Sequence, residues 1–401
     1  MSRVLKQLSE LGNIVTGKTP STSNSELWDG EIPFITPTDI KGFSSYYQGH
    51  TERTVSEYGA TKQAKTILPR NSVCVSCIAT IGKMCLTDCK SITNQQINSI
   101  IPNVLNDYRY ILYMLRYNLP YIQLVGGGSG SGTPIISKNK FSKFKFIVED
   151  DLQKQRRIAS ILSAYDNLIE NNNKRIRLLE QMAENLYKEW FVRFRFPGHE
   201  KAEFENGLPK GWSEEVASDV IDVMSGGTPK TEREDFYGGE IPFYTPKDAD
   251  DSIFVYSTIT SITKEGLTHC NSQFYPVNTL MITARGTVGK LSLLAVPMAM
   301  NQSCFALSFK DRNNPYYLYY SIKNEVSKLK KMANGGVFDT IIVKTFDHLK
   351  VVLPNNELLG VFEKKVSTIL GQIKYLQRQN SLLSRQRDLL LPRLMSGKLE
   401  V

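Results

Sequence analysis

The sequence predicts an α+β fold in which one globular domain occurs twice and each copy is followed by a long helix. Residues 17–40, GKTPSTSNSELWDGEIPFITPTDI, recur as residues 226–249, GGTPKTEREDFYGGEIPFYTPKDA. Each copy ends in an apolar strand, at residues 144–148 and 349–353, and a long helical pattern follows directly. We therefore expect two similar globular domains separated by two long antiparallel coiled-coil helices, with the pseudo-twofold symmetry of a tandem repeat.

Further blocks recur in the same order. Residues 71–83 match 278–290, Asn94-Gln95 matches Asn301-Gln302, and the tyrosine-rich helical segment 108–123 matches 315–330. The spacing between blocks drifts by only a few residues, so the differences are loop insertions rather than rearrangements. The expected segments are a first domain (1–149), a central helix (150–191), a linker (192–212), a second domain (213–354) and a C-terminal helix with its tail (355–401).

Within each domain the strands are short and the helices come late. The runs EIPFIT, SVCVSCIA and INSII are β-branched or alternating and are bounded by Gly, Pro and Asn, which is typical of strands. A unit of about 150 residues also fits the usual domain size.

The two long helices each carry an apolar seven-residue repeat that contains one asparagine. Asp150 and Asp151 supply N-cap chemistry, and neither Pro nor Gly follows before about Phe191. Asn172 and Asn380 match, and a polar residue in such a seam usually fixes register or partner. The first seam also includes Ile161, Leu168, Met182 and Leu186, beside a second stripe of Leu162, Ile169, Ile176, Ala183 and Trp190. We expect the helices to pair through Ile158, Tyr165, Asn172 and Leu179 on the first and Ile369, Ile373, Leu376, Asn380 and Leu383 on the second, which ends at Leu391-Pro392.

Two interpretations of these stripes stay open. One is the core of an ordinary bundle or an oligomerisation helix. The other is an internal antiparallel pair that spaces the two domains, which the duplication favours because each helix follows its own domain. A helix of this kind spans about 55 to 60 Å at about 1.5 Å per residue. The second stripe leaves apolar surface for further partners.

Composition favours a soluble, cytoplasmic protein with an anionic partner. The formal charge is +9, from 49 Lys and Arg against 40 Asp and Glu, which favours a polyanionic partner. No run of about 18 apolar residues occurs, and the N-terminus lacks the apolar core of a signal peptide.

The sequence contains no recognisable catalytic or cofactor motif. The glycine-rich segment 126–134 lacks a following Lys-Ser/Thr, its second copy at 333–340 reduces to ANGGVFDT, and a mobile loop is the better interpretation. The run GTVGKL at 286–291 is too short for a phosphate-binding loop, and the Asp/Asn-Pro-Pro-Tyr/Phe signature of methyltransferases is absent. The histidines are scattered and share no motif. They are His50, His199, His269 and His348.

The cysteine cluster could suggest zinc, but the repeat argues against it. Cys74, Cys77, Cys85 and Cys89 are matched in the second copy by side chains that cannot form a zinc site, namely Met281, Ala284, Ser292 and Val296. We expect these cysteines to be buried small side chains in strands, and we expect no metal.

Turns rich in Thr, Ser, Lys and Gly are the candidate contacts to an anionic partner. Such side chains donate to phosphates, and Arg, Lys, Asn, Gln and Asp can read base edges. Each alone is also a common turn former. The candidate DNA-binding residues are Lys18, Thr19, Thr36, Thr38, Asp39, Thr80, Lys83, Gln95, Lys138 and Lys140 in the first copy, and Thr228, Lys230, Thr245, Lys247, Asp248, Arg285, Thr287, Lys290 and Gln302 in the second.

The two copies share a frame and differ in particular loops. EIPF, Thr-Pro-x-Asp and Asn-Gln recur, whereas loops 42–60 and 250–268 are unlike each other. A shared frame with different loops is what two recognition domains for two different half-sites would require.

Together these segments resemble the specificity subunit of type I restriction-modification systems over essentially the whole chain. The resemblance includes the repeated 17–40 segment, ENLYKEWFVRFRFPG (184–198), LPKGW (208–212) and LLLPRLMSGKL (389–399). It implies two target-recognition domains that each read one half of a bipartite double-stranded DNA site, with paired helices that set the spacer. It also implies two modification subunits that use S-adenosylmethionine to methylate adenine, and restriction subunits that use ATP and Mg and cleave DNA. The chain itself would be non-catalytic and bind no cofactor or metal.

One departure from the resembled pattern concerns the N-terminus. The first copy begins near Leu8 without a Leu-Pro-x-Gly-Trp lead, which fits a circular arrangement in which the segment after Leu391 packs near the N-terminus. Three alternatives remain. A self-contained enzyme would need a cofactor or metal motif, and a coiled-coil scaffold would have loops as alike as their frames. A stand-alone DNA-binding protein would lack a restriction partner.

Overall fold

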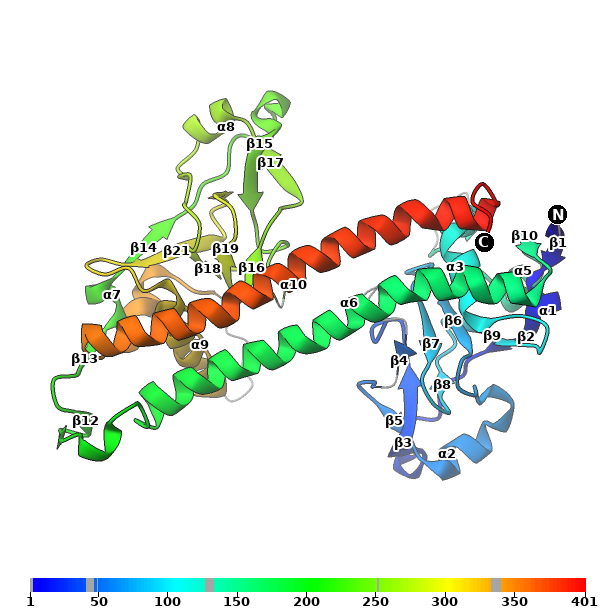
Figure 1. The fold of residues 1–401 in the computed structure, drawn as a ribbon, viewed down its shortest axis with the longest axis horizontal. Coiled ribbons are helices and arrows are strands. Elements are labelled where there is room, and N and C mark those ends of the chain that lie inside the picture. The colour runs from blue at the N-terminus through cyan, green and yellow to red at the C-terminus, as the bar shows by residue number, and fades with distance from the viewer. Residues whose placement is uncertain (1–2, 41–46, 49, 127–132, 251, 333–339) are drawn as a thin grey trace. The chain divides into compact units, whose positions relative to one another are not determined.

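The computed structural model describes residues 3–40, 47–48, 50–126, 133–250, 252–332 and 340–401 (Figure 1). The chain forms two compact units. The first unit contains residues 1–175 and 376–401, and the second contains residues 176–375. Each unit therefore includes one α+β domain and part of both long helices.

The first domain is closed by its own first and last strands. Strand β1 (Arg3–Gln7) pairs antiparallel with β10 (Lys145–Glu149), in the register that sets Arg3 opposite Glu149. The short helix α1 (Leu8–Leu11) then leads into β2 (Gly12–Thr16), where the main sheet begins.

Two sheets build the body of this domain. The five-stranded sheet has the order β2-β9-β6-β7-β4, and the three-stranded sheet has the order β5-β3-β8. The bounds are β3 (Trp28–Ile35), β4 (Tyr47–Gln48), β5 (Thr54–Val55), β6 (Val73–Ser76), β7 (Met84–Thr87), β8 (Ile92–Thr93) and β9 (Ile97–Pro102). The short helices are η1 (Ser25–Leu27), α2 (Glu57–Lys62), η3 (Ala64–Thr66), α4 (Leu119–Gly126) and α5 (Lys138–Ser142).

The tyrosine-rich helix α3 (Tyr108–Tyr117) joins this sheet to the long helices. It begins at Asp107, whose carboxylate accepts the backbone N–H groups of Arg109 and Tyr110, as a helix N-cap does. Its side chains are buried in one core with those of the main sheet and the start of the central helix, including Val73, Tyr110 and Ile158.

The second domain repeats this topology strand for strand, which confirms the predicted α+β repeat. Its closing pair is β13 (Ser213–Val216) with β22 (Lys350–Leu353), and its sheets have the orders β14-β21-β18-β19-β16 and β17-β15-β20. The strands are β14 (Ile221–Ser225), β15 (Tyr237–Tyr244), β16 (Phe254–Val255), β17 (Thr260–Ile262), β18 (Leu280–Thr283), β19 (Leu291–Leu294), β20 (Ala299–Met300) and β21 (Cys304–Phe309). The helices are α7 (Ala217–Val220), η6 (Glu234–Phe236), α8 (Lys264–Thr268), α9 (Pro315–Met332) and η7 (Val343–His348).

Two long helices run antiparallel. They are α6 (Leu152–Tyr187), which continues in a π-helical turn over Lys188–Val192, and α10 (Asn356–Ser396). Within the first unit, Asp166 pairs with Arg387 and Asn172 with Asn380, so residue numbers rise along one helix as they fall along the other.

Aromatic side chains fill the second unit at the end of α6. The Phe191 ring lies 4.8 Å from that of Tyr317 and 5.0 Å from that of Phe362, measured between centroids. Trp212 of the LPKGW segment lies 5.1 Å from Phe196. The aromatic residues of the two linker motifs therefore form packing contacts within the second unit. The linker itself contains η5 (His199–Lys201) and a hairpin of β11 (Phe204–Glu205) and β12 (Leu208–Pro209).

The end of α10 differs from the sequence-based expectation. We expected the helix to end at Leu391-Pro392, but it continues through Pro392 to Ser396. Proline removes one backbone hydrogen bond from a helix. Here the last turn is held by the burial of Leu394 and Met395 and by Arg3, whose guanidinium donates to both of their carbonyls. The C-terminal segment thus packs against the N-terminal strand, as the circular arrangement requires.

The buried line along α6 also differs from the expected seam. Leu168 and Met182 are 50% and 59% exposed, whereas the second stripe, from Leu162 to Ala183, is buried. The reason is that α6 also packs against the globular domain in each unit. Leu162 lies in the core of the first domain, whereas in the second unit Glu184 pairs with Lys323 and the Tyr187 ring stacks on that of Tyr320. Of the expected pairing residues, Ile158, Asn172, Ile369, Ile373 and Leu376 are buried, and Tyr165, Leu179, Asn380 and Leu383 are partly buried.

In the described ranges, no helix is both long enough and apolar enough to cross a membrane. Several predicted loops lie outside the described residues. They are residues 127–132 and 333–339 of the glycine-rich segment and its second copy, residues 42–46 and 49 of the first variable loop, and residue 251 of the second.

Candidate functional site

The motifs shared by the two repeats meet in each domain, in the turns that follow four strands. In the first domain these turns follow β2, β3, β6 and β8. The backbone of Asn94 donates to Ile35 at 3.1 Å, and that of Cys77 donates to Gln96 at 2.7 Å. The second domain repeats both bonds at 3.0 and 2.8 Å, from Asn301 to Tyr244 and from Ala284 to Ser303.

A glycine begins the first of these turns because no side chain fits there. A Cβ on Gly17 would lie 2.2 Å from the carbonyl oxygen of Asn94, and one on Gly226 would lie 2.2 Å from that of Asn301. Such a distance is far below van der Waals contact. The Gly-x-Thr-Pro and Asn-Gln motifs are therefore in direct backbone contact in both domains.

The same Thr–Gln hydrogen bond follows from this contact in each domain. Thr19 Oγ1 donates to Gln95 Oε1 at 2.6 Å, and Thr228 makes the same bond to Gln302. Both glutamines are exposed and both threonines are partly exposed. These side chains are predicted site residues that the structure brings together.

The aspartate of the Thr-Pro-x-Asp turn is fully engaged by its own surroundings. Asp39 Oδ2 accepts the backbone N–H of Thr36 at 2.8 Å and its hydroxyl at 2.6 Å, while Oδ1 accepts the N–H of Glu52 at 2.9 Å. Asp248 accepts the equivalent bonds from Thr245, at 2.8 and 2.7 Å, and from Ile259 at 2.7 Å. These bonds favour the turn-forming role over base reading, because each aspartate ties its turn to the loop that follows.

The Gly-Lys turn closes onto the Thr-Pro-x-Asp turn. Its backbone is held by a hydroxyl at the end of the preceding strand, since Lys83 N donates to Ser76 Oγ at 2.9 Å. Lys83 Nζ then donates to the Pro37 carbonyl at 2.7 Å. In the second domain, Lys290 N donates to Thr283 Oγ1 at 3.0 Å and Thr287 Oγ1 donates to Pro246 at 3.3 Å. The candidate Lys83 thus has a structural partner, whereas Thr80 and Thr287 are exposed.

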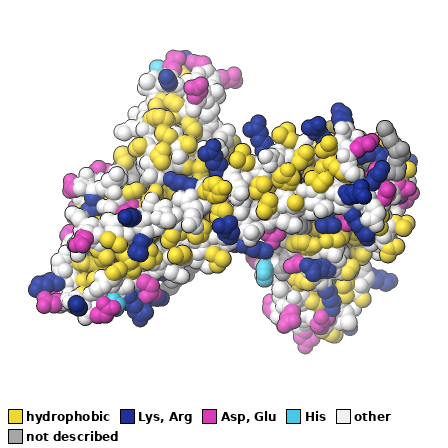
Figure 2. All heavy atoms as spheres, viewed as in Figure 1, with side chains coloured by type: hydrophobic (Ala, Val, Ile, Leu, Met, Phe, Trp, Pro, Cys, Tyr) yellow, Lys and Arg dark blue, Asp and Glu magenta, His cyan; other side chains and the backbone are white. Residues whose placement is uncertain are grey.

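Most of the remaining candidates are exposed. Lys140 Nζ donates to the Val125 carbonyl at 2.8 Å, so it also braces its own domain. On the face shown in Figure 2, Lys and Arg side chains are interspersed with acidic and hydrophobic ones. Charge alone therefore does not mark one surface on this face. The exposed candidates in this group are Thr38, Lys138, Lys140, Lys230, Lys247, Arg285 and Lys18.

Three of the clustered cysteines are buried as expected, and one is not. Cys74, Cys77 and Cys85 are at most 1% exposed, and burial raises the pKa of the Cys77 thiol to about 11. Cys89 is exposed, which corrects the expectation for it, because it lies in the turn after β7 rather than in a strand. Within the described part of the chain, no group of three or more His, Cys, Asp or Glu residues could hold a metal ion.

Sequence patterns gave no indication of a buried polar cluster in the first unit. Asp166 of α6 accepts hydrogen bonds from Tyr113 and Arg116 of α3 and from Arg387 of α10. Asp166 is 2% exposed and Arg387 is 6% exposed. The only available signal was a charged residue beside an apolar stripe, which normally indicates a solvated face.

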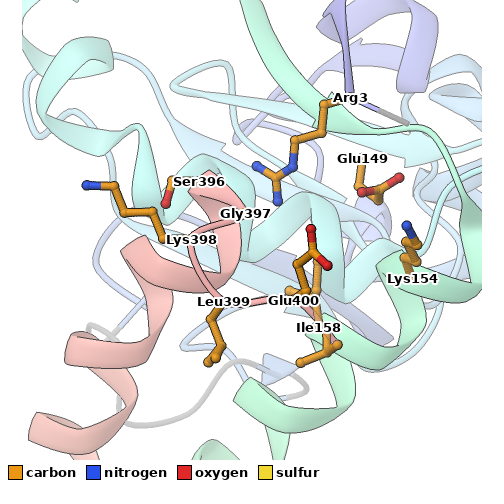
Figure 3. A pocket seen from close by; sticks show the side chains of 10 residues that line it. Arg3, Glu149, Lys154, Ile158, Ser396, Gly397, Lys398, Leu399 and Glu400 are labelled. Atoms are coloured by element: carbon orange, nitrogen blue, oxygen red, sulfur yellow. The ribbon is translucent and has the colours of Figure 1, made fainter. Parts of the chain in front are cut away.

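A cavity of about 190 Å³ lies where the two chain ends meet in the first unit (Figure 3). Arg3, Glu149, Lys154 and Ile158 line it together with residues 396–401. Arg3 points toward Gly397, whereas the Lys398 side chain points away from the cavity (Figure 3). The cavity is lined by charged residues of both signs, and Arg3 beside it donates to carbonyls of α10. We therefore interpret it as part of the packing between the two chain ends rather than as a ligand site.

Comparisons with known proteins agree with this architecture. Residues 4–181 and 209–380 match the model of the type I restriction modification DNA specificity domain. The chain is 26% identical over 407 residues to the type I restriction enzyme MjaIX specificity subunit of Methanocaldococcus jannaschii, covering 99% of this chain and 93% of that one. It is 23% identical over 359 residues to the HindI specificity subunit of Haemophilus influenzae, covering 74% and 78%.

Among solved structures, the crystal structure of the S subunit of a type I restriction-modification system from M. genitalium has the same fold. The TM-score is 0.58 at 15% sequence identity, and the match covers 98% of this chain and 96% of that one.

Proposed function

Since the chain belongs to the family of type I restriction-modification DNA specificity proteins, we propose that each of its two domains reads one half of a bipartite DNA site. Members of this family recognise DNA and are not themselves catalytic. The observation that most supports the proposal is that two domains of one topology hold the same four turns but attach different loops to them. The loops that follow the Thr-Pro-x-Asp turns would read bases, and the shared turns would position them.

The paired helices would set the length of DNA between the two half-sites. Their register in the first unit is fixed by the Asn172–Asn380 hydrogen bond at 2.9 Å and by the ion pair of Asp166 with Arg387. A rigid pair with a fixed register suits a spacer, because a slipping pair would accept several spacings.

The helices would also bind two adenine-methyltransferase subunits. Large apolar side chains stay exposed on both of them, and on α10 three of them recur at seven-residue intervals and so share one helix face. They are Leu168, Leu382 and Leu389 in the first unit and Leu178, Met182 and Tyr375 in the second. S-adenosylmethionine would act in these partners, and ATP and Mg in restriction subunits.

A loop exchange tests the division of labour between the domains. Loop 42–60 is replaced by the corresponding loop of a relative that directs methylation to another site, and methylated adenines are mapped in host DNA. We expect one half-site to change while the other half-site and the spacer stay the same. A change in both half-sites, or in neither, would contradict modular recognition. The matched control exchanges loop 250–268, which should alter the other half-site only.

The spacer role needs a separate experiment. One heptad is inserted after Asn172 and another before Asn380, which lengthens both helices together and keeps the seam in phase. We expect a longer preferred spacer with both half-sites unchanged. An unchanged spacer would refute the proposal that the helices set the spacer length, because the two domains would then be positioned by something other than the helices.

A further inference from the structure

We propose that the Thr19–Gln95 and Thr228–Gln302 pairs are phosphate contacts that hold each domain on DNA without reading its sequence. The inference rests on the proposed function, and it assigns a chemical role to one exposed side-chain pair in each domain. It separates these residues from the loops that distinguish one base from another.

The Thr–Gln pair is identical in two domains that are expected to read different half-sites. A residue pair that has the same type, the same place and the same hydrogen bond in both domains cannot account for a difference between their targets. Its role is therefore either to build the domain or to make a contact that every DNA sequence offers. Phosphate and sugar are the groups that every sequence offers.

The other shared residues have roles in folding that account for them, but the two glutamines do not. Gly17 and Gly226 allow close backbone approach, and Asp39 and Asp248 use both carboxylate oxygens to hold their turns. The side chain of Gln95 is exposed, and in the described residues it bonds only to Thr19. A side chain that is exposed in both copies and supports no buried contact is available for a ligand.

The hydrogen bond within each pair decides which atoms of the glutamine remain available to a ligand. Bidentate recognition of adenine by glutamine uses the amide oxygen and the amide N–H₂ together. Thr19 already donates to the Gln95 amide oxygen, and Thr228 does the same at Gln302, so each glutamine chiefly offers N–H donors. Phosphate oxygens are acceptors only, which matches such a donor. Exposed cations also flank both pairs, Lys18 directly before Thr19 and Lys230 two residues after Thr228.

The test uses the complete complex of the chain with its modification subunits and DNA duplexes of defined sequence. One duplex carries the mapped site, two others have one altered half-site each, and a fourth is unrelated. Gln95→Met and Gln302→Met remove the donors and keep the side-chain size. We expect each variant to bind all four duplexes about three- to tenfold more weakly. The ratio between specific and unrelated DNA, and the methylated sequence, should not change.

Several controls make the outcome decisive. Gln153→Met changes another exposed glutamine, at the start of α6, and should leave binding unchanged. The thermal midpoints of all variants should match that of the parent chain, because the substituted side chains are exposed. If a variant lost discrimination at one half-site alone, its glutamine would read bases, and the proposal would be overturned. Affinities that stay within twofold of the parent's would also overturn it. If the parent complex itself showed no site preference, the proposed function would fail first.

Discussion

Glu363 on α10 takes the place that Gln155 takes on α6, at the start of the tyrosine-rich helix of its own domain. Gln155 Oε1 accepts the backbone N–H of Asp107 at 2.8 Å, and Glu363 Oε1 accepts that of Tyr317 at 2.7 Å. Gln155 is neutral and fully buried. Burial raises the pKa of Glu363 to about 7, although the backbone N–H bonds it accepts act in the opposite direction. The two side chains thus hold the starts of equivalent helices with different charge, Gln155 through the N-cap residue Asp107 and Glu363 through the first turn of α9.

Glu363→Gln should make the second unit less sensitive to pH. The folded-state pKa of about 7 lies above the ordinary 4.5, so the stability linked to Glu363 is complete below about pH 4.5 and is lost as the pH rises through 7. The variant should therefore melt at nearly the parent temperature at pH 5 and about 2–4 °C higher at pH 8. Calorimetry across this range measures the difference, and a gain that is equal at both pH values would contradict the prediction.

The reverse substitution in the first unit is the matched control. The Gln155 amide nitrogen donates to Asn106 Oδ1 at 3.1 Å and to the Glu149 carbonyl at 2.7 Å. A glutamate there would face both oxygens without a proton to donate. Gln155→Glu should destabilise the first unit, and more at pH 8 than at pH 5.

The repeat made most of the fold predictable. Segments that occur in both copies form the shared strands and turns, and segments that differ between the copies are loop insertions. Thr36 to Asp39 and Thr245 to Asp248 were recognisable as one turn from sequence, and both form it. The face of α6 was not predictable to the same degree. A seven-residue pattern fits neighbouring stripes almost equally well, and only the packing of α6 against its own domain leaves Leu168 exposed.

Which shared residues have structural partners also required the structure. Lys83 and Asp39 looked equivalent to Gln95 as candidate contacts, since all three are polar residues in recurring turns. Their hydrogen bonds divide them, because Lys83 and Asp39 bond to backbone groups of neighbouring turns, whereas Gln95 is exposed and bonds to the side chain of Thr19. Hydrogen bonds between residues far apart in the sequence cannot be read from one sequence without homologues.

Asp166→Ala should strongly destabilise the first unit. The aspartate balances the buried guanidinium groups of Arg116 and Arg387, and removing one partner of a buried ion pair costs about 3–5 kcal/mol. Urea unfolding should show the loss. Glu57→Gln is the comparison, because its pair with Lys90 at 2.7 Å is largely exposed and should contribute at most about 1 kcal/mol. Equal losses in the two variants would mean that the buried cluster adds little.

Arg3→Ala should loosen the end of α10. The Arg3 guanidinium donates to the Leu394 carbonyl at 2.9 Å and also to that of Met395, at a helix end where positive charge is favourable. Amide hydrogen exchange over residues 390–399 should become faster, and the first unit should lose about 1.5–3 kcal/mol. Lys398→Ala removes a nearby charge that points away from the junction and should leave exchange unchanged (Figure 3). If the exchange rates in Arg3→Ala matched those of the parent chain, apolar packing alone would stabilise the end of α10.

The effects of Asn172→Leu and Asn380→Leu on the free energy of unfolding should not be additive, because the two side chains are bonded to each other. Asn172 Nδ2 donates to Asn380 Oδ1 and to Gln379 Oε1, each at 2.9 Å, so Asn172→Leu alone leaves polar groups without partners and should cost about 1–3 kcal/mol. Adding Asn380→Leu replaces the polar seam by an apolar one and should recover much of this loss. Because a buried asparagine fixes register, the double variant should also methylate sites with a wider range of spacers. Additive losses with an unchanged spacer would show that the pair fixes neither stability nor register.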